Sequence, residues 1–295
     1  MKLDRLVFYN AHHFGDLHVS QELVKAIITR VRAESYEYFH IGVGRDILWG
    51  LPEVEHKSLS GLPINIQESR RPIIFTEDKR TAYVNTWYGA SPSFIGIASC
   101  TLKTLYNLFL AIAFELDVQL PPLGSWAIPA SPSVVFNGYD RALVLIANCM
   151  PMSEQATEID LHAIVDDLVR ECPRAIFMFT NPPPVGPRHS GALYVDEMFG
   201  TEENLRECVV VADHADVIVG QSSGPYTFAL NKRNLLDSNK TFICFCKAKR
   251  VAHWAGKLEE CKTYWEPRTD LTTVKDKITT VVNQVVERKE EYRYG

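Results

Sequence analysis

The stretch "DVIVGQSSGPYTFALN", residues 216–231, decides how this chain is expected to fold. Its apolar run ends at Gly220, which is typical of a buried strand that stops at a turn. Pro225 stands where the first residue of a helix is expected, because a helix start leaves that N–H unbonded in any case. The stretch therefore predicts a strand, a short turn and a helix, the repeating unit of parallel α/β folds.

The predicted turn is rich in hydrogen-bond donors. Ser222 and Ser223 add hydroxyls to free backbone N–H groups, and Gly224 lets a ligand approach the backbone. With Gln221 they make a set that suits an anion, best a phosphate, at the positive end of the helix dipole. A serine-rich helix cap without a ligand is the alternative.

The same letters also spell G-x-S-x-G, the nucleophile-elbow pattern of α/β-hydrolases. In that interpretation Ser222 is the nucleophile, and Asp237 and His253 follow it in the required order. Pro225 after the second glycine and the lack of an earlier HGG-type segment weigh against it. A serine hydrolase therefore stays as an alternative function.

Outward from this stretch, strands and helices alternate through both halves of the chain. The run "RALVLIANC", residues 141–149, is typical of a strand buried on both faces. A first helix is predicted from Val19, Leu23, Ile27 and Val31, with Ser20 or a neighbour as its cap, and residues 50–72 look irregular. Other strands are predicted near residues 6–9, 36–42, 72–75, 82–89, 175–181, 216–221 and 241–246. Other helices are predicted near residues 101–114, 161–169, 202–215 and 274–285.

Residues 120–140 have the composition of a linker, with prolines, glycines and serines and no clear periodicity. We place the domain boundary there, which gives an acceptor-side domain over residues 1–125 and a nucleotide-sugar-binding domain over residues 126–295. The fold class is α/β, with two Rossmann-like doubly wound parallel-sheet domains facing across a cleft.

The first predicted loop, "HHFGDLHVSQELV" at residues 12–24, gathers titratable groups where a strand stops and a helix begins. Such a loop lies at the carboxyl edge of a parallel sheet, where ligands bind. Asp16, with His12, His13 and His18 nearby, is suited to take a proton from an attacking hydroxyl. A histidine as the base, oriented by Asp16, is the alternative.

These two segments together resemble the GT-B glycosyltransferases, and most closely the heptosyltransferase-like group. The resemblance implies that Gly15-Asp16 supplies the catalytic base and that Ser222, Ser223 and Gly224 hold the donor diphosphate. It implies transfer of a sugar from a nucleotide-diphosphate donor to a glycan or glycolipid acceptor hydroxyl, with inversion and without a metal or other cofactor. A GT-B-shaped protein that binds a nucleotide or glycan without turnover is the non-enzymatic alternative.

Other polar residues follow the predicted strands. Asn148 and Asn181 are expected to share the nucleotide-binding edge, and Asn85 and Trp87 to contact the acceptor sugar. His162, His189 and His214 are interpreted as surface residues.

Composition excludes several function classes. The net charge of −5 without a long basic run disfavours nucleic acid as a partner, and no apolar run is long enough for a transmembrane helix. Seven cysteines without a CxxC pair indicate reduced thiols in a cytoplasmic protein, and no residue set has metal-ligand spacing. The sequence does not indicate an oligomeric state.

Overall fold

The computed structural model divides the chain into two compact units, Met1–Pro129 and Ala130–Gly295. The predicted boundary between residues 125 and 126 lies outside the described residues and stays a prediction, as does most of the helix predicted near residues 101–114. The structure describes residues 3–43, 48, 50–64, 72–87, 112–113, 116, 118–119, 141–148, 159–199, 205–221, 224–245 and 260–294.

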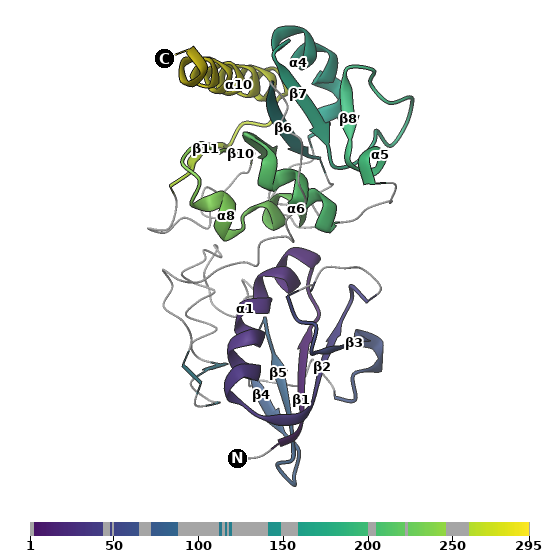
Figure 1. The fold of residues 1–295 in the computed structure, drawn as a ribbon. Helices are drawn as coiled ribbons and strands as arrows, with labels where there is room; N and C mark the ends of the chain where they lie inside the picture. The colour runs from purple at the N-terminus through teal and green to yellow at the C-terminus, as the bar shows by residue number, and fades with distance from the viewer. Residues whose placement is uncertain are drawn as a thin grey trace. The chain divides into compact units, whose positions relative to one another are not determined.

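The first unit contains a five-stranded sheet in the order β3-β2-β1-β5-β4 (Figure 1). Its strands are β1 (Leu3–Asn10), β2 (Ala33–His40), β3 (Glu55–Ser58), β4 (Ile73–Phe75) and β5 (Thr81–Asn85). Strand β4 runs antiparallel to β5, whereas the other neighbours are parallel, so this sheet is mixed and not purely parallel as predicted. Strand β3 and the short 3-10 helix η1 (Leu59–Gly61) lie in a region predicted to be irregular.

Helix α1 (Phe14–Arg30) packs on this sheet and starts earlier than predicted. The predicted apolar stripe of Val19, Leu23 and Ile27 is buried, which confirms the helix. The residue before the first turn is His13, so Ser20 is not the cap. The Ser20 hydroxyl instead lies 2.8 Å from the Leu17 carbonyl oxygen and 2.7 Å from the Tyr38 hydroxyl. Ser20 is thus a buried contact between helix and sheet.

The second unit contains a six-stranded, wholly parallel sheet in the order β11-β10-β9-β6-β7-β8. Counted along the chain, this is the 3-2-1-4-5-6 order of doubly wound nucleotide-binding domains. The predicted strands at its centre are confirmed, whereas β8 and β11 were not predicted. The strands are β6 (Ala142–Ala147), β7 (Ala175–Phe179), β8 (Ala192–Tyr194), β9 (Val217–Gly220), β10 (Thr241–Phe245) and β11 (Lys262–Glu266).

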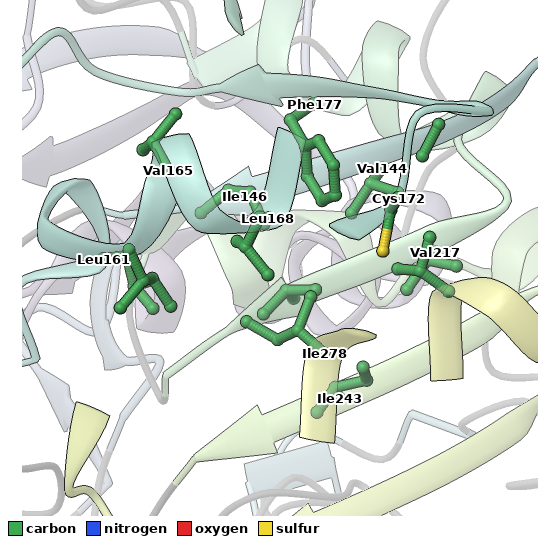
Figure 2. Close-up of a cluster of buried hydrophobic side chains, with 14 of the residues drawn as sticks. Val144, Ile146, Leu161, Val165, Leu168, Cys172, Phe177, Val217, Ile243 and Ile278 are labelled. Atoms are coloured by element: carbon green, nitrogen blue, oxygen red, sulfur yellow. The ribbon is translucent and has the colours of Figure 1, made fainter. Parts of the chain in front are cut away.

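Helices cover both faces of this second sheet. On one face lie η4 (Leu161–Ile164), α4 (Val165–Glu171) and α10 (Leu271–Tyr294), and Figure 2 shows the core that they enclose. On the other lie α5 (Val195–Phe199), α6 (Leu205–His214), α7 (Gly224–Ala229) and α8 (Lys232–Leu235).

Strand residues alternate between these two cores. Val144 and Ile146 of β6 face the core of Figure 2, whereas Leu143 and Leu145 face the other. This confirms the prediction of a strand buried on both faces. The described cysteines, Cys172, Cys208, Cys244 and Cys261, are buried thiols that form no disulfide. Within the described ranges, no helix is both long and apolar enough to span a membrane.

Gly220 closes the packing between β9, β6 and α7. A Cβ at this position would lie 2.8 Å from Tyr226 Cδ2, 3.0 Å from Ala147 Cβ and 3.2 Å from the Ala147 carbonyl oxygen. Gly224, four residues later, differs: apart from its chain neighbours and the backbone of its own helix, no described atom lies within 4 Å of its Cβ position. The first glycine is therefore required by packing, and the second borders open space.

We expect opposite results from alanine at these two glycines. Gly220→Ala should destabilise the second unit by about 1–3 kcal/mol, because the added methyl group overpacks a buried contact. Gly224→Ala is the matched control and should change the free energy of unfolding by less than about 0.5 kcal/mol. Urea denaturation followed by circular dichroism measures both. Equal stabilities for the two variants would contradict the assigned packing of Gly220.

Candidate functional site

The strand order of the second sheet marks one edge as its ligand site. Connections run in opposite directions from β6 and β9, and ligands of doubly wound sheets bind at this switch, beyond the carboxyl ends of the strands. Ala147 pairs with Gly220 in the register of β6 and β9. Asn148 and Gln221 therefore leave the sheet side by side. This place is called the carboxyl edge of the second sheet below.

The turn predicted to hold phosphate lies at this edge. It joins Gly220, the last residue of β9, to Gly224, the first residue of α7, so the helix starts one residue before Pro225. Gln221 is only 3% exposed. Ser222 and Ser223 lie outside the described residues, and their role stays a prediction.

The structure brings Asn148 and Asn181 together at the same edge, as expected. The Asn148 Oδ1 atom accepts hydrogen bonds from Thr180 Oγ1 and from the Asn181 backbone N–H, both at 3.0 Å. Its Nδ2 atom donates to the Asn181 carbonyl at 3.0 Å and lies 2.8 Å from His162 Nε2. Asn148 thus holds the residues that follow β7, whereas the sequence predicted that it would contact a nucleotide.

His162 is not the surface residue that was predicted. It is 8% exposed, and its ring stacks on Phe179, with ring centroids 4.8 Å apart, and on His189 at 5.8 Å. Burial lowers its pKa, opposed by the carboxylate of Asp160. The sequence around His162 carries no signal that would place it here. Only its contact with Asn148 in the structure identifies it as part of this site. His189 and His214 are half-buried.

The G-x-S-x-G alternative fails on the position of its acidic partner. Asp237 lies in the turn that leads into β10, where Asp237 Oδ1 accepts from Asn239 N–H at 2.9 Å. That is the amino end of β10, whereas the 220–224 turn follows the carboxyl end of β9, which runs parallel to it. A five-residue strand separates its ends by roughly 16 Å. His253 lies outside the described residues.

The first sheet has an equivalent edge at the ends of β1 and β5. Asn10 and Asn85 each close a turn: Asn10 Oδ1 accepts from His12 N–H at 2.9 Å, and Asn85 Oδ1 from Trp87 N–H at 3.0 Å. These turns bring the rings of His12 and Trp87 together, with centroids 6.4 Å apart. Asn85, predicted to contact an acceptor, thus uses its Oδ1 atom to hold Trp87.

Asp16 lies in the first turn of α1 and not in a loop, with Gly15 directly before it. Its carboxylate Oδ2 accepts a hydrogen bond from the His13 backbone N–H at 3.2 Å. Burial raises the pKa of Asp16 to about 7, and the His13 hydrogen bond opposes this shift. A carboxyl group of this pKa exchanges protons readily near neutral pH, as a general base must.

The three histidines of this segment have different surroundings. His13 is exposed at the helix start, and His12 is half-buried, with a pKa lowered by burial and by His13. His18 lies inside α1, fully buried, with its Nδ1 2.9 Å from Gln21 Nε2. His18 therefore faces the interior, which corrects its expected place in a polar loop, and His12 is the histidine nearest the strand end.

Sequence reasoning missed a buried polar chain beneath this edge. The Tyr38 hydroxyl lies 2.6 Å from Thr86 Oγ1, and Asn10 Nδ2 donates to the same Thr86 oxygen at 3.3 Å. Ser20 joins the chain through Tyr38. Burial raises the pKa of Tyr38 to about 12, so its hydroxyl stays protonated. These hydrogen bonds tie helix α1, which carries Asp16, to strands β1 and β2 and to Thr86, which follows β5.

Solved structures of low sequence identity share this architecture. A glycosyl transferase family 9 protein from Veillonella parvula DSM 2008 has a TM-score of 0.54 and 7% identity, covering 98% of this chain and 99% of its own. The heptosyltransferase WaaC of E. coli, with ADP, has a TM-score of 0.52 and 9% identity, covering 95% and 99%. The E. coli ADP-heptose lps heptosyltransferase II has a TM-score of 0.52 and 12% identity, covering 97% and 99%.

The chain has the GT-B fold. No protein-family model matches it, and no curated protein matches its sequence. The similarity to these solved structures establishes the GT-B architecture. It agrees with the resemblance inferred from the segments at residues 12–24 and 216–231. Within the described part of this GT-B chain, no group of three or more His, Cys, Asp or Glu side chains is arranged to hold a metal ion.

The raised pKa of Asp16 predicts a pH-dependent stability. The folded state keeps its proton up to about pH 7, whereas the unfolded chain releases it near the ordinary value of 3.8. Between these values the folded state binds more protons, so the contribution of Asp16 to stability falls as pH rises from about 4 to 7. Asp16→Asn should therefore melt higher than the wild type at pH 8 and nearly equal to it at pH 4.

Calorimetric melting temperatures of both proteins across this pH range test the assignment. Asp276→Asn, which replaces an exposed carboxylate of α10, is the matched control for the loss of one carboxylate. An Asp16→Asn protein less stable than the wild type at pH 8 would mean that the charged carboxylate stabilises the fold.

Proposed function

We propose that this protein is a glycosyltransferase that moves a sugar from a nucleotide-diphosphate donor to an acceptor hydroxyl. The observation that carries the proposal is the Asp16 carboxyl group at the edge of the first sheet, held at a pKa near 7 in a chain with the GT-B fold. Strongly shifted pKa values of this kind cluster at functional sites, because a catalytic base needs a pKa near the working pH.

The second unit is proposed to bind the donor. The open space beside Gly224 lets a diphosphate reach the backbone of the 220–224 turn, and the hydroxyls of Ser222 and Ser223 are proposed to donate to it. The solved E. coli heptosyltransferase WaaC carries ADP, which supports a nucleoside diphosphate as the leaving group here.

The first unit is proposed to activate the acceptor. Ionised Asp16 takes the proton of the acceptor hydroxyl while that oxygen attacks the anomeric carbon, and the bond from that carbon to the diphosphate oxygen breaks. The nucleoside diphosphate leaves with the bonding electron pair, and the configuration at the anomeric carbon inverts. Asp16 then returns its proton to water. The His13 backbone N–H donates to this carboxyl group, and the ring of Trp87 and its partner His12 are proposed to border the acceptor.

Two variants should separate catalysis from donor binding. Asp16→Asn keeps the size and the hydrogen bond from His13 but removes the base, so turnover should fall by roughly 10²–10⁴ with little change in donor affinity. Ser222→Ala should weaken donor binding by about 1–3 kcal/mol, because one charge-assisted hydrogen bond is lost. Release of the nucleotide from UDP-, GDP-, ADP- and CMP-linked sugars, with calorimetric titration of the free nucleotides, measures both effects.

Alanine at His12, His13 and His18 provides the comparison. If Asp16→Asn keeps near-normal turnover while one histidine variant is inactive, that histidine is the base. Covalent labelling of Ser222 by a serine-directed phosphonate would overturn the transferase in favour of a hydrolase. Binding of a nucleotide sugar without any turnover would support the non-enzymatic binding protein instead.

A further inference from the structure

The side chain of Asn148 has no hydrogen-bonding capacity left for a ligand. Its Oδ1 atom accepts from Thr180 Oγ1 and Asn181 N–H, and its two Nδ2 hydrogens point to the Asn181 carbonyl and to His162 Nε2. An amide offers two acceptor and two donor positions, and all four are used. Asn148 therefore orients the residues that follow β7.

These contacts also fix the protonation of His162. A backbone N–H only donates and a backbone carbonyl only accepts, so Asn181 settles which atom of the Asn148 amide is oxygen. The Nδ2 atom then donates to His162 Nε2, which must carry no proton. His162 is therefore neutral, with its single ring proton on Nδ1, a buried atom with no hydrogen-bond partner in the described part of the chain.

Aromatic stacking holds the His162 ring in place. The ring planes of His162 and Phe179 lie 20° apart, and those of His162 and His189 lie 7° apart. Because Phe179 ends β7, the stack joins η4 to the strand end that Asn148 clamps. The Asn181 side chain is half-exposed and makes no hydrogen bond within the part of the chain that the structure describes. The clamp thus presents one amide, that of Asn181, at the carboxyl edge of the second sheet.

We infer that Asn148 and neutral His162 are positioning residues that hold the Thr180–Asn181 turn in the shape needed to bind the donor, with Asn181 as the residue that contacts it. The inference rests on the proposed function and adds to it how the donor edge is regulated. Protonation of His162 would place an N–H against the Asn148 Nδ2 hydrogen, so the clamp loses one hydrogen bond. Donor binding is therefore coupled to the charge of a histidine that the donor does not touch.

Several groups around His162 set the pH at which this occurs. Burial and His189 lower its pKa below the ordinary 6.5, whereas Asp160 and the carbonyls of Asn181 and Pro182 oppose the shift. A lowered pKa keeps the clamp closed at and above pH 6.5 and opens it only as the pH falls further. The other charged or titratable groups facing the stack are Tyr194, Asp166, which contacts His189, and Arg188, which lies over Tyr194.

Two variants remove the clamp while keeping its shape. Asn148→Leu keeps the approximate size of the side chain but removes all four of its hydrogen bonds, and His162→Phe keeps the stacked ring without the acceptor nitrogen. In each, the Asn181 backbone amide should exchange with deuterium at least tenfold faster. The dissociation constant of the tightest-binding member of UDP, GDP, ADP and CMP should rise about tenfold, with kcat changed less than twofold. His189→Phe keeps the stack and does not touch Asn148, so it should leave both quantities unchanged.

Histidine ring ¹⁵N spectra and a pH series complete the test. The wild type should show His162 as the Nδ1–H form at pH 7.5, and its nucleotide affinity should fall below pH 6.5. His162→Gln should reduce this loss of affinity, because its side-chain oxygen can accept from Asn148. A proton on Nε2 at pH 7.5, or unchanged Asn181 exchange in Asn148→Leu, would overturn the clamp. Faster exchange with unchanged nucleotide affinity would overturn its role in donor binding. If none of the four nucleotides binds the wild type, the proposed function fails, and the exchange and ring spectra alone decide the clamp.

Discussion

Backbone groups that leave a parallel sheet at its carboxyl edge must find hydrogen-bond partners, and asparagine side chains supply them here. Asn10 and Asn85 end β1 and β5, and Asn148 follows β6. The Oδ1 atom of each accepts a backbone N–H, that of His12, Trp87 and Asn181 respectively. A buried backbone donor left unpaired would cost about 1–3 kcal/mol, so these side chains fix the turns on which the candidate sites stand.

This constraint separates residues that shape a site from residues that act in it. Asn85 and Asn148 are residues of a type that often contacts ligands. The Oδ1 atom of Asn85 instead accepts from Trp87 N–H in its own turn, and that of Asn148 accepts from Asn181 N–H at the end of β7. Asp16 differs, because its partly buried carboxyl group makes one backbone hydrogen bond and has a pKa raised by desolvation to about 7. A fold gains no stability from such a group at neutral pH, which makes a chemical role the simplest explanation for it.

The sequence predicted the elements that bury apolar runs and missed those that do not. Strand β6 was evident because all six of its residues are buried. Strands β3, "EHKS", and β11, "KTYWE", have no fully buried residue, and β8, "ALY", is only three residues long, so hydrophobic patterning could not reveal them. Ser20 was taken for a helix cap because serine favours that position, but its tertiary partner Tyr38 places it inside α1. His162 was assigned to the surface because no local pattern reveals the ring stack that buries it. That stack joins His162 to residues 17 and 27 positions further along the chain. The turn at residues 220–224 was placed correctly at a strand end, because the strand, glycine and proline signals are local.

The central claim is that the switch between β6 and β9 binds the diphosphate of a nucleotide. A crystal structure of the protein grown with a saturating nucleoside diphosphate tests it most directly. The account predicts that both phosphates lie at the carboxyl edge of the second sheet, within hydrogen-bonding distance of the backbone of residues 221–224, with the Asn181 side chain facing the nucleotide. Phosphates bound at the edge of the first sheet beside Asp16, or on the amino side of either sheet, would contradict it.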